Sequence, residues 1–271
     1  MAGRDRDEAA ARAVAGSADL GAGCGPGLLY VRARVEYDGT DFYGFQFQSS
    51  VRTVQGELER ALAAVTGQAV RIVGAGRTDT GVHAVGQVIA FHTAWRHSLE
   101  ALERAWGANL PPDIAVWGLE QAPADFHPRF SARRRRYRYT IWNGRRASPL
   151  HRRYAWVYPQ RLDEEMLAQA AKVLIGEHDF AAYGRPPQGG NSVRTVYTAT
   201  WTRCGDSLWF DIEGNAFLQR MVRRLVGVMA QIGRGEKPLA WVSEVLASRE
   251  SGRCAPPAPA CGLCLMEIGY E

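Results

Sequence analysis

Lysine is nearly absent from this sequence of 271 residues, because only Lys172 and Lys237 stand among its 33 basic side chains. No apolar run approaches the roughly 18 residues that span a bilayer, so we expect no transmembrane helix. The five cysteines, an odd number in a long chain, do not indicate a disulfide framework. The first residues lack the apolar segment of a secretory signal. These absences predict a soluble, cytoplasmic chain with reduced thiols.

The length and composition favour two domains. A chain of 271 residues with 46% hydrophobic and 23% charged residues is ordinary for a globular protein. Residues 1–27 show no sustained apolar period and end in Gly25-Pro26-Gly27, which predicts a disordered N-terminal tail. We expect an N-terminal domain at residues 28–128 and a C-terminal domain at residues 129–271.

The charge pattern indicates a polyanionic partner. The net charge is +5, and ten arginines fall between Arg129 and Arg153 with no Asp or Glu among them. Tyr137, Tyr139 and Trp142 interrupt this run. Guanidinium groups bind phosphates bidentately, and aromatic rings stack on bases, so the run favours RNA. A solvated charged face is the alternative, and genome composition can explain the use of arginine in place of lysine.

Apolar periodicity and turn signals place the expected elements. Strands are expected at 29–37, 70–73, 87–92, near 116, and at 133–143, 154–158, 193–203, 208–212 and 263–268. Helices are expected at 53–64, 98–106, 163–175, 217–232 and 239–247, with Thr53, Ser98 and Asp163 as the first three caps. Strands and helices segregate, and the hairpins need antiparallel pairing, so the class is α+β. The two halves show a similar element order, and we expect a binding cleft between them.

One glycine-rich loop carries the strongest chemical signal. Residues 74–83 read Gly-Ala-Gly-Arg-Thr-Asp-Thr-Gly-Val-His, which is neither a P-loop nor a dinucleotide-binding fingerprint. Asp79 in this loop could cap it, bind a metal, or act as a nucleophile or base. Asp79 and His83 have no further acidic or histidine pair at ligand spacing, so a metal is disfavoured. Cys261 and Cys264 lack the second pair that zinc needs, and we interpret them as incidental thiols.

Several motifs in order resemble the tRNA pseudouridine synthase A family. They are Tyr37-Asp38-Gly39-Thr40, Gly44-Phe45-Gln46, Thr53-Val54-Gln55, Gly76-Arg77-Thr78-Asp79, Gly81-Val82-His83, Asn109-Leu110-Pro111, Asp125-Phe126-His127, Arg136-Tyr137-Arg138-Tyr139, Phe217-Leu218, Met221-Val222-Arg223, Ala258-Pro259-Ala260 and Gly262-Leu263. The resemblance runs from about Leu28 to Tyr270. Thr80 stands where the family usually has Ala, and Phe47 where it commonly has Arg.

The resemblance implies a fold and an activity. It implies two ferredoxin-like α+β halves whose antiparallel sheets join, with helices packed on one side and an active-site cleft between the halves. It implies an isomerase that converts uridine to pseudouridine at positions 38 to 40 of the tRNA anticodon stem-loop. The family works as a homodimer on tRNA without a metal or an organic cofactor, so we expect neither here, and no membrane partner.

The resemblance also assigns residues. Asp79 matches the catalytic aspartate, Tyr137 the active-site tyrosine, and Arg223 the best candidate for the partner of Asp79. Substrate contacts are expected from Arg77, His83 and Leu263. RNA contacts are expected from the arginine-rich strand, that is from Arg133, Arg134, Arg135, Arg136 and Arg138. Attack by Asp79 on C1′, attack on C6, and removal of a sugar proton all stay open at this point.

Periodicity adds expectations about two of these elements. Arg220, Arg223, Arg224 and Gly227 fall on one stripe of the helix expected at 217–232, with Arg224 facing water. On the strand at 133–143, Tyr137 and Tyr139 share one face and the even-numbered arginines take the other.

Two other classes of protein remain as alternatives. A non-catalytic RNA-binding protein would keep the arginine-rich strand but would not need the Arg77–Asp79 loop and Arg223 together. A metal-dependent nuclease would need clustered acids. The combination of Asp79 with Arg223 therefore favours the synthase.

Overall fold

The computed structural model describes residues 27–186 and 190–271 of the chain. The disordered tail expected at residues 1–27 thus lies outside the described residues, apart from Gly27 itself. Within those two ranges, no helix is long and apolar enough to cross a membrane.

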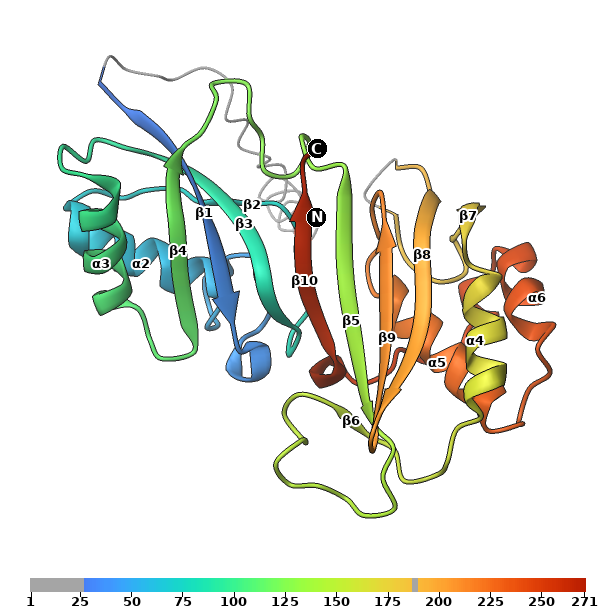
Figure 1. Cartoon of the computed structure of the whole chain (residues 1–271). Coiled ribbons are helices and arrows are strands. Elements are labelled where there is room, and N and C mark those ends of the chain that lie inside the picture. The colour runs from blue at the N-terminus through green and yellow to red at the C-terminus, as the bar shows by residue number, and fades with distance from the viewer. Residues whose placement is uncertain (1–26, 187–189) are drawn as a thin grey trace, which may run out of the picture.

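The described part of the chain forms one ten-stranded sheet, whose N-terminal half has the order β4-β1-β3 with a short β2 beside β3 (Figure 1). The elements of this half are β1 (Leu29–Tyr37), α2 (Val54–Thr66), β2 (Val73–Gly74), β3 (His83–Thr93), α3 (Leu99–Asn109) and β4 (Ile114–Gln121), with a 3-10 turn at Gly39–Asp41. In sequence this is β-α-β-β-α-β, the ferredoxin-like pattern that the resemblance implies.

The C-terminal half repeats the pattern with the strand order β10-β5-β9-β8. Its elements are β5 (Arg134–Trp142), α4 (Glu164–Lys172), β8 (Val193–Cys204), β9 (Ser207–Gly214), α5 (Met221–Gly233) and β10 (Leu263–Gly269). Additions to the pattern are β6 (Trp156–Val157), β7 (Gly176–Asp179), α6 (Trp241–Ser248) and the 3-10 turns Ser251–Arg253 and Ala260–Gly262. Pairing is antiparallel within this core, and the halves join where β10 runs parallel to β3. The α+β prediction is confirmed.

One row of paired residues crosses the join and shows which face is covered. Tyr37 on β1 pairs with Ala84 on β3, then Leu265 on β10, Tyr137 on β5 and Ile212 on β9 follow in register. Residues directly opposite each other in a sheet share a face. Four of the five are buried, and Tyr137 packs against the hydrophobic clusters of both halves. The helices of both halves therefore cover the same side of the sheet.

Three helices begin at the caps expected from the sequence. The side chains of Thr53, Ser98 and Asp163 accept backbone N–H groups of Gly56, Ala101, and Glu165 with Met166. Smaller differences concern lengths: the strands expected at 70–73 and 154–158 shrink to Val73–Gly74 and Trp156–Val157, and the helix expected at 163–175 ends at Lys172. The N–H of Ile72 donates to the carboxylate of Glu59 at 3.0 Å instead of joining a strand ladder.

The helix expected at 217–232 begins only at Met221, which corrects that expectation. The preceding backbone packs closely on Gly184, where an added Cβ would lie 2.5 Å from the Cβ of Leu218. Arg220, the residue before the helix, has a left-handed φ of 63°. Tertiary packing on Gly184 therefore overrides the helical pattern for the first turn, and Arg220 is not part of the helical stripe.

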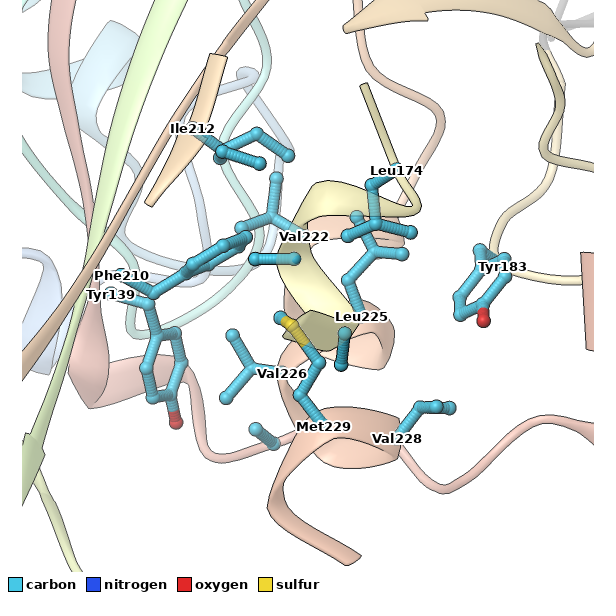
Figure 2. Close-up of a cluster of buried hydrophobic side chains, with 14 of the residues drawn as sticks. Tyr139, Leu174, Tyr183, Phe210, Ile212, Val222, Leu225, Val226, Val228 and Met229 are labelled. Atoms are coloured by element: carbon cyan, nitrogen blue, oxygen red, sulfur yellow. The ribbon is translucent and has the colours of Figure 1, made fainter. Parts of the chain in front are cut away.

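The core of the C-terminal half lies between α5 and the sheet (Figure 2). Apolar side chains of α5 meet buried side chains of β5 and β9, and these residues are Val222, Leu225, Val226, Met229, Tyr139, Phe210 and Ile212. This packing fixes the helix on the sheet and so sets the position of Arg223, one residue beyond Val222.

Truncating this core is expected to destabilise the protein. Leu225 is 1% exposed, so Leu225→Ala should lower the free energy of unfolding by about 2–5 kcal/mol through lost burial and a cavity. Leu150 is 87% exposed, and Leu150→Ala should change it by less than about 0.5 kcal/mol. Urea unfolding of both variants measures the difference, and equal effects would show that α5 is not packed as described.

Candidate active site

The loop that carries Asp79 connects β2 to β3 and is held by a neighbouring turn. The N–H of Phe45 donates to the carbonyl of Thr78 at 3.1 Å, and the N–H of Gly81 donates to the carbonyl of Phe42 at 3.3 Å. Gly81 has a φ of 78°, a conformation that glycine adopts without strain. The backbone on both sides of Asp79 is thereby fixed, which positions its carboxylate.

Two side chains of the sheet complete the support of this loop. The amide of Gln87, itself fully buried, accepts from the N–H of Gly76 at 3.2 Å and donates to its carbonyl at 2.8 Å. The hydroxyl of Tyr37 lies 2.8 Å from the hydroxyl of Thr78. Burial raises the pKa of Tyr37, so it stays a neutral hydrogen-bonding group. The loop is thus attached to the sheet at two points close to Asp79.

An ion pair between the two halves is the central feature of the site. Nη1 of Arg223 on α5 lies 3.1 Å from Oδ2 of Asp79, although the residues are 144 positions apart in sequence. The two side chains are only 15% and 22% exposed. Nε of Arg223 also donates to the carbonyl of Ala258 at 2.7 Å, and the N–H of Ala258 donates back to the carbonyl of Arg223 at 3.0 Å. The guanidinium is therefore oriented before any substrate binds.

Tyr137 lies beside this pair on the central row of the sheet. Its hydroxyl would be 3.9 Å from a Cβ added to Gly76, and its ring meets Phe217 edge-on with centroids 5.3 Å apart. Burial, with a further contribution from the charge of Asp79, raises the pKa of Tyr137 to about 12. At neutral pH the side chain is a protonated phenol, a ring suited to stacking.

Leu263 and Arg77 occupy opposite environments around this centre. Leu263, at the start of β10, is 7% exposed and belongs to the same hydrophobic cluster as Val82 and Tyr139. It is the strand partner of Tyr139 on β5. Arg77 is exposed, two residues before Asp79. The side chain of Leu263 is therefore buried and apolar, whereas that of Arg77 is accessible from solvent.

His83 is itself buried and lies beside the half-buried Asp38 and the exposed Tyr154. It is 6% exposed, its Nδ1 accepts from the N–H of Gly39 at 3.0 Å, and it lies 3.2 Å from Oδ1 of Asp38. The hydroxyl of Tyr154 donates to Oδ2 of the same carboxylate at 2.8 Å. His83 thus connects the turn at Gly39 to the segment of Tyr154 through Asp38. These contacts give it a supporting position beside the Asp79 loop.

The protonation of His83 predicts a pH-dependent stability. Burial lowers the pKa of His83 below its ordinary value of 6.5, against the opposing effect of Asp38. The unfolded chain then binds a proton more readily than the folded one, so the free energy of unfolding falls as pH falls from about 7.5 to 5.5. The slope from one such group is at most about 1.4 kcal/mol per pH unit.

Denaturant unfolding across this pH range checks the prediction with two variants. His83→Gln should flatten the slope, whereas His97→Gln, at an exposed position, should leave it as in the parent protein. A slope that persists in His83→Gln would assign the pH dependence to other groups.

Strand β5 distributes its arginines over two faces. Nε and Nη2 of Arg138 each lie 2.9 Å from the carboxylate of Asp211, and Nη2 of Arg136 lies 3.1 Å from Glu267. These arginines alternate with Tyr137 and so lie on the face opposite the helices and Asp79. The alternation expected from the sequence is confirmed.

The other arginines of this run are placed differently. Nη1 of Arg135 donates to the carbonyl of Asn215 at 2.6 Å and Nη2 to that of Arg129 at 2.7 Å, on the helix side of the sheet. Burial lowers the pKa of Arg135. Arg133 and Arg134 are exposed. The structure therefore does not bring the five arginines together with Asp79 as one group.

Arg224 corrects a second expectation. Its Nη1 donates to the carbonyl of Ala182 at 3.2 Å, and its Nε is buried without a hydrogen-bond partner. Arg224 is only partly exposed to water, because its guanidinium lies against the segment at Ala182. Gly227 on the same stripe also has a packing role, since an added Cβ would lie 2.5 Å from the carbonyl of Pro256.

The thiols of Cys261 and Cys264 are free in the structure. Burial raises the pKa of Cys264 to about 12 and also raises that of Cys261. Over residues 27–186 and 190–271, no group of three or more His, Cys, Asp or Glu side chains is placed to hold a metal ion.

Sequence reasoning did not identify Gln87 or Ala258 as supports of the site. Ala258 belongs to the motif Ala258-Pro259-Ala260, but only the folded structure shows that its backbone carbonyl accepts a hydrogen bond from Arg223. Gln87 carried no signal, because a lone glutamine in a strand has no characteristic pattern.

Comparisons with known proteins identify the family of the chain. A model of the family described as tRNA pseudouridine synthase matches residues 33–131 and 170–271. "tRNA pseudouridine synthase A" of Chloroflexus aurantiacus is 46% identical over 242 residues, covering 86% of this chain and 86% of that protein. The proteins of the same name from Roseiflexus sp. (45% over 246 residues; 89% and 90% covered) and Klebsiella pneumoniae (41% over 237 residues; 87% and 88% covered) are similar. The chain belongs to the tRNA pseudouridine synthase family, whose members are isomerases acting on uridine in tRNA.

Proposed function

We propose that this protein converts uridine to pseudouridine at positions 38 to 40 of the tRNA anticodon stem-loop, with Asp79 as the essential carboxylate. The observation that carries the proposal is the ion pair of Asp79 with Arg223, 3.1 Å long and formed across the two halves beside Tyr137. An isolated RNA-binding surface would have no need of a shielded carboxylate at this point.

The reaction needs little beyond an oriented carboxylate. The N1–C1′ bond breaks, the uracil turns and a C5–C1′ bond forms; C5 then loses its proton and N1 takes one up, so no redox step or external group is required. Attack at C1′, attack at C6 and removal of a sugar proton all use ionised Asp79. Arg223 orients the carboxylate through the 3.1 Å contact of its Nη1 with Oδ2 of Asp79. The hydrogen bond from Arg223 to the Ala258 carbonyl keeps the guanidinium in place.

Recognition of the target follows from the groups around the pair. A uridine in a stem or its adjoining loop must leave the stack to reach Asp79. Tyr137 offers the neutral ring of its phenol for stacking on the uracil, and Leu263 offers an apolar surface. Arg77, exposed beside Asp79, is positioned to fill the vacated place or to bind the flanking phosphate.

The remaining RNA contacts are assigned according to the face of the sheet on which each arginine of β5 lies. Arg133 and Arg135 are proposed to contact the tRNA near the site. Arg134, Arg136 and Arg138 would contact only RNA that reaches the other face of the sheet, and two of them already hold acidic partners. A homodimer working in the cytoplasm, without metal or organic cofactor, completes the proposal.

The test is an assay on unmodified tRNA transcripts in the presence of EDTA, with pseudouridine located by carbodiimide labelling. We expect modification at positions 38 to 40, and none there in control transcripts with cytidine at these positions. Binding without modification would favour the non-catalytic RNA-binding alternative. Activity that is lost in EDTA and restored by a metal would contradict the proposal.

A further inference from the structure

A basic cavity lies beside the beginning of α5, apart from the Asp79 loop. Its volume is about 150 Å³, and it is lined by Arg185, Gln219, Arg220 and Arg224. A bridge between Arg185 and Gln219 joins the two segments that form its wall. The volume is several times that needed for one water molecule. Three arginines and one glutamine therefore line a space large enough for a small anion.

The arginines of this cavity lack anionic partners. None of Arg185, Arg220 and Arg224 forms an ion pair with an acidic side chain of the described residues. The cavity thus offers positive charge that no acidic side chain of the described residues balances, and a bound anion would balance it.

The backbone at the N-terminus of α5 adds to the positive electrostatic potential of the cavity. Arg220 is the N-cap residue of α5, a helix of 13 residues, and no side chain caps the first turn. The positive end of the helix dipole and its first amides attract anions. Arg220 keeps a left-handed φ of 63°, a conformation that residues other than glycine rarely adopt.

The position of the cavity identifies the anion. Arg223, which pairs with Asp79, lies between Arg220 and Arg224 in sequence. The three residues occupy the beginning of α5, over a length of about 5 Å along the helix, which is one turn. Arg185 and Arg220 are exposed, so a polymer can reach the cavity from solvent. We propose that the cavity binds one backbone phosphate of the RNA strand that carries the target uridine. This inference rests on the proposed function, since it needs an RNA strand at Asp79.

The experiment combines protein variants with neutral linkages in the RNA. A synthetic anticodon stem-loop is made in versions that each carry one methylphosphonate near the target uridine. Arg220→Gly removes the guanidinium and suits the left-handed backbone, so the fold should be retained. Arg224→Gln is the second variant. Arg161→Gln is the control, because Arg161 is 83% exposed and its neighbour in the structure is Glu164.

We expect one linkage at which the parent protein loses about tenfold in affinity, which corresponds to 1.4 kcal/mol. Arg220→Gly should bind the unmodified stem-loop about tenfold more weakly, be insensitive to that linkage, and show a salt slope smaller by about one. Arg224→Gln should repeat this pattern, and Arg161→Gln should behave as the parent protein does.

Additive effects of Arg220→Gly and every methylphosphonate would overturn the phosphate site. Pseudouridine formation by the parent protein on the unmodified stem-loop is measured in the same samples. Its absence would reject the proposed function, whereas its presence with additive effects would reject the cavity alone. Thermal unfolding of each variant verifies that the loss of affinity does not come from a loss of fold.

Discussion

Asp79→Asn is expected to reduce pseudouridine formation to the detection limit while tRNA affinity stays the same or rises. The amide is nearly isosteric with the carboxylate, so the loop held by the turn at Phe42–Phe45 should keep its shape. An amide neither attacks a carbon of the nucleotide nor accepts a proton usefully at neutral pH. Contacts to phosphates dominate RNA affinity, and removing a negative charge relieves repulsion with the backbone.

Single-turnover kinetics with a radiolabelled tRNA, beside a binding titration, measures both effects. Asp211→Asn is the matched control, because Asp211 also pairs with an arginine, Arg138, but on the opposite face of the sheet. The control should retain activity close to that of the parent protein. Turnover of Asp79→Asn at a tenth of the parent rate, a barrier change of only about 1.4 kcal/mol, would show that Asp79 is not essential.

Arg223→Met should lower the single-turnover rate by about 100-fold or more and should also destabilise the fold. Methionine fills similar space, but Asp79 loses the cation that orients its carboxylate. At 15% and 22% exposure the pair is largely shielded, so leaving Asp79 unpaired should cost about 1–3 kcal/mol of unfolding free energy. Losing the hydrogen bond to the Ala258 carbonyl adds to this cost.

A double-mutant cycle separates these contributions. Asp79→Asn combined with Arg223→Met should destabilise less than the sum of the single changes, because the charge left unpaired in each single variant is absent. Arg138→Met serves as the control and should leave the rate unchanged. Additive free energies of unfolding would mean that the 3.1 Å contact carries no coupling.

Local features of the fold are readable in the sequence because their causes are local. Thr53, Ser98 and Asp163 cap helices through hydrogen bonds to residues two or three positions later, so spacing alone predicts them. The alternation along β5 separates Tyr137 from Arg136 and Arg138 for the same reason, since side chains of a strand alternate between faces. The glycines around Asp79 likewise predict a loop from the sequence alone.

The sequence by itself thus predicted most of the elements, the α+β class and, through its ordered motifs, the family, and it marked Asp79, Tyr137 and Arg223 as candidate site residues. Only the tertiary structure decided how they meet. Asp79 and Arg223 come together across 144 residues because β10 pairs with both β3 and β5 while α5 packs on the sheet. Packing of the preceding segment on Gly184 shortened α5 at Arg220, and a hydrogen bond to Ala182 holds Arg224 beside a basic cavity. Such contacts depend on which apolar faces are buried together, and no local spacing encodes that choice.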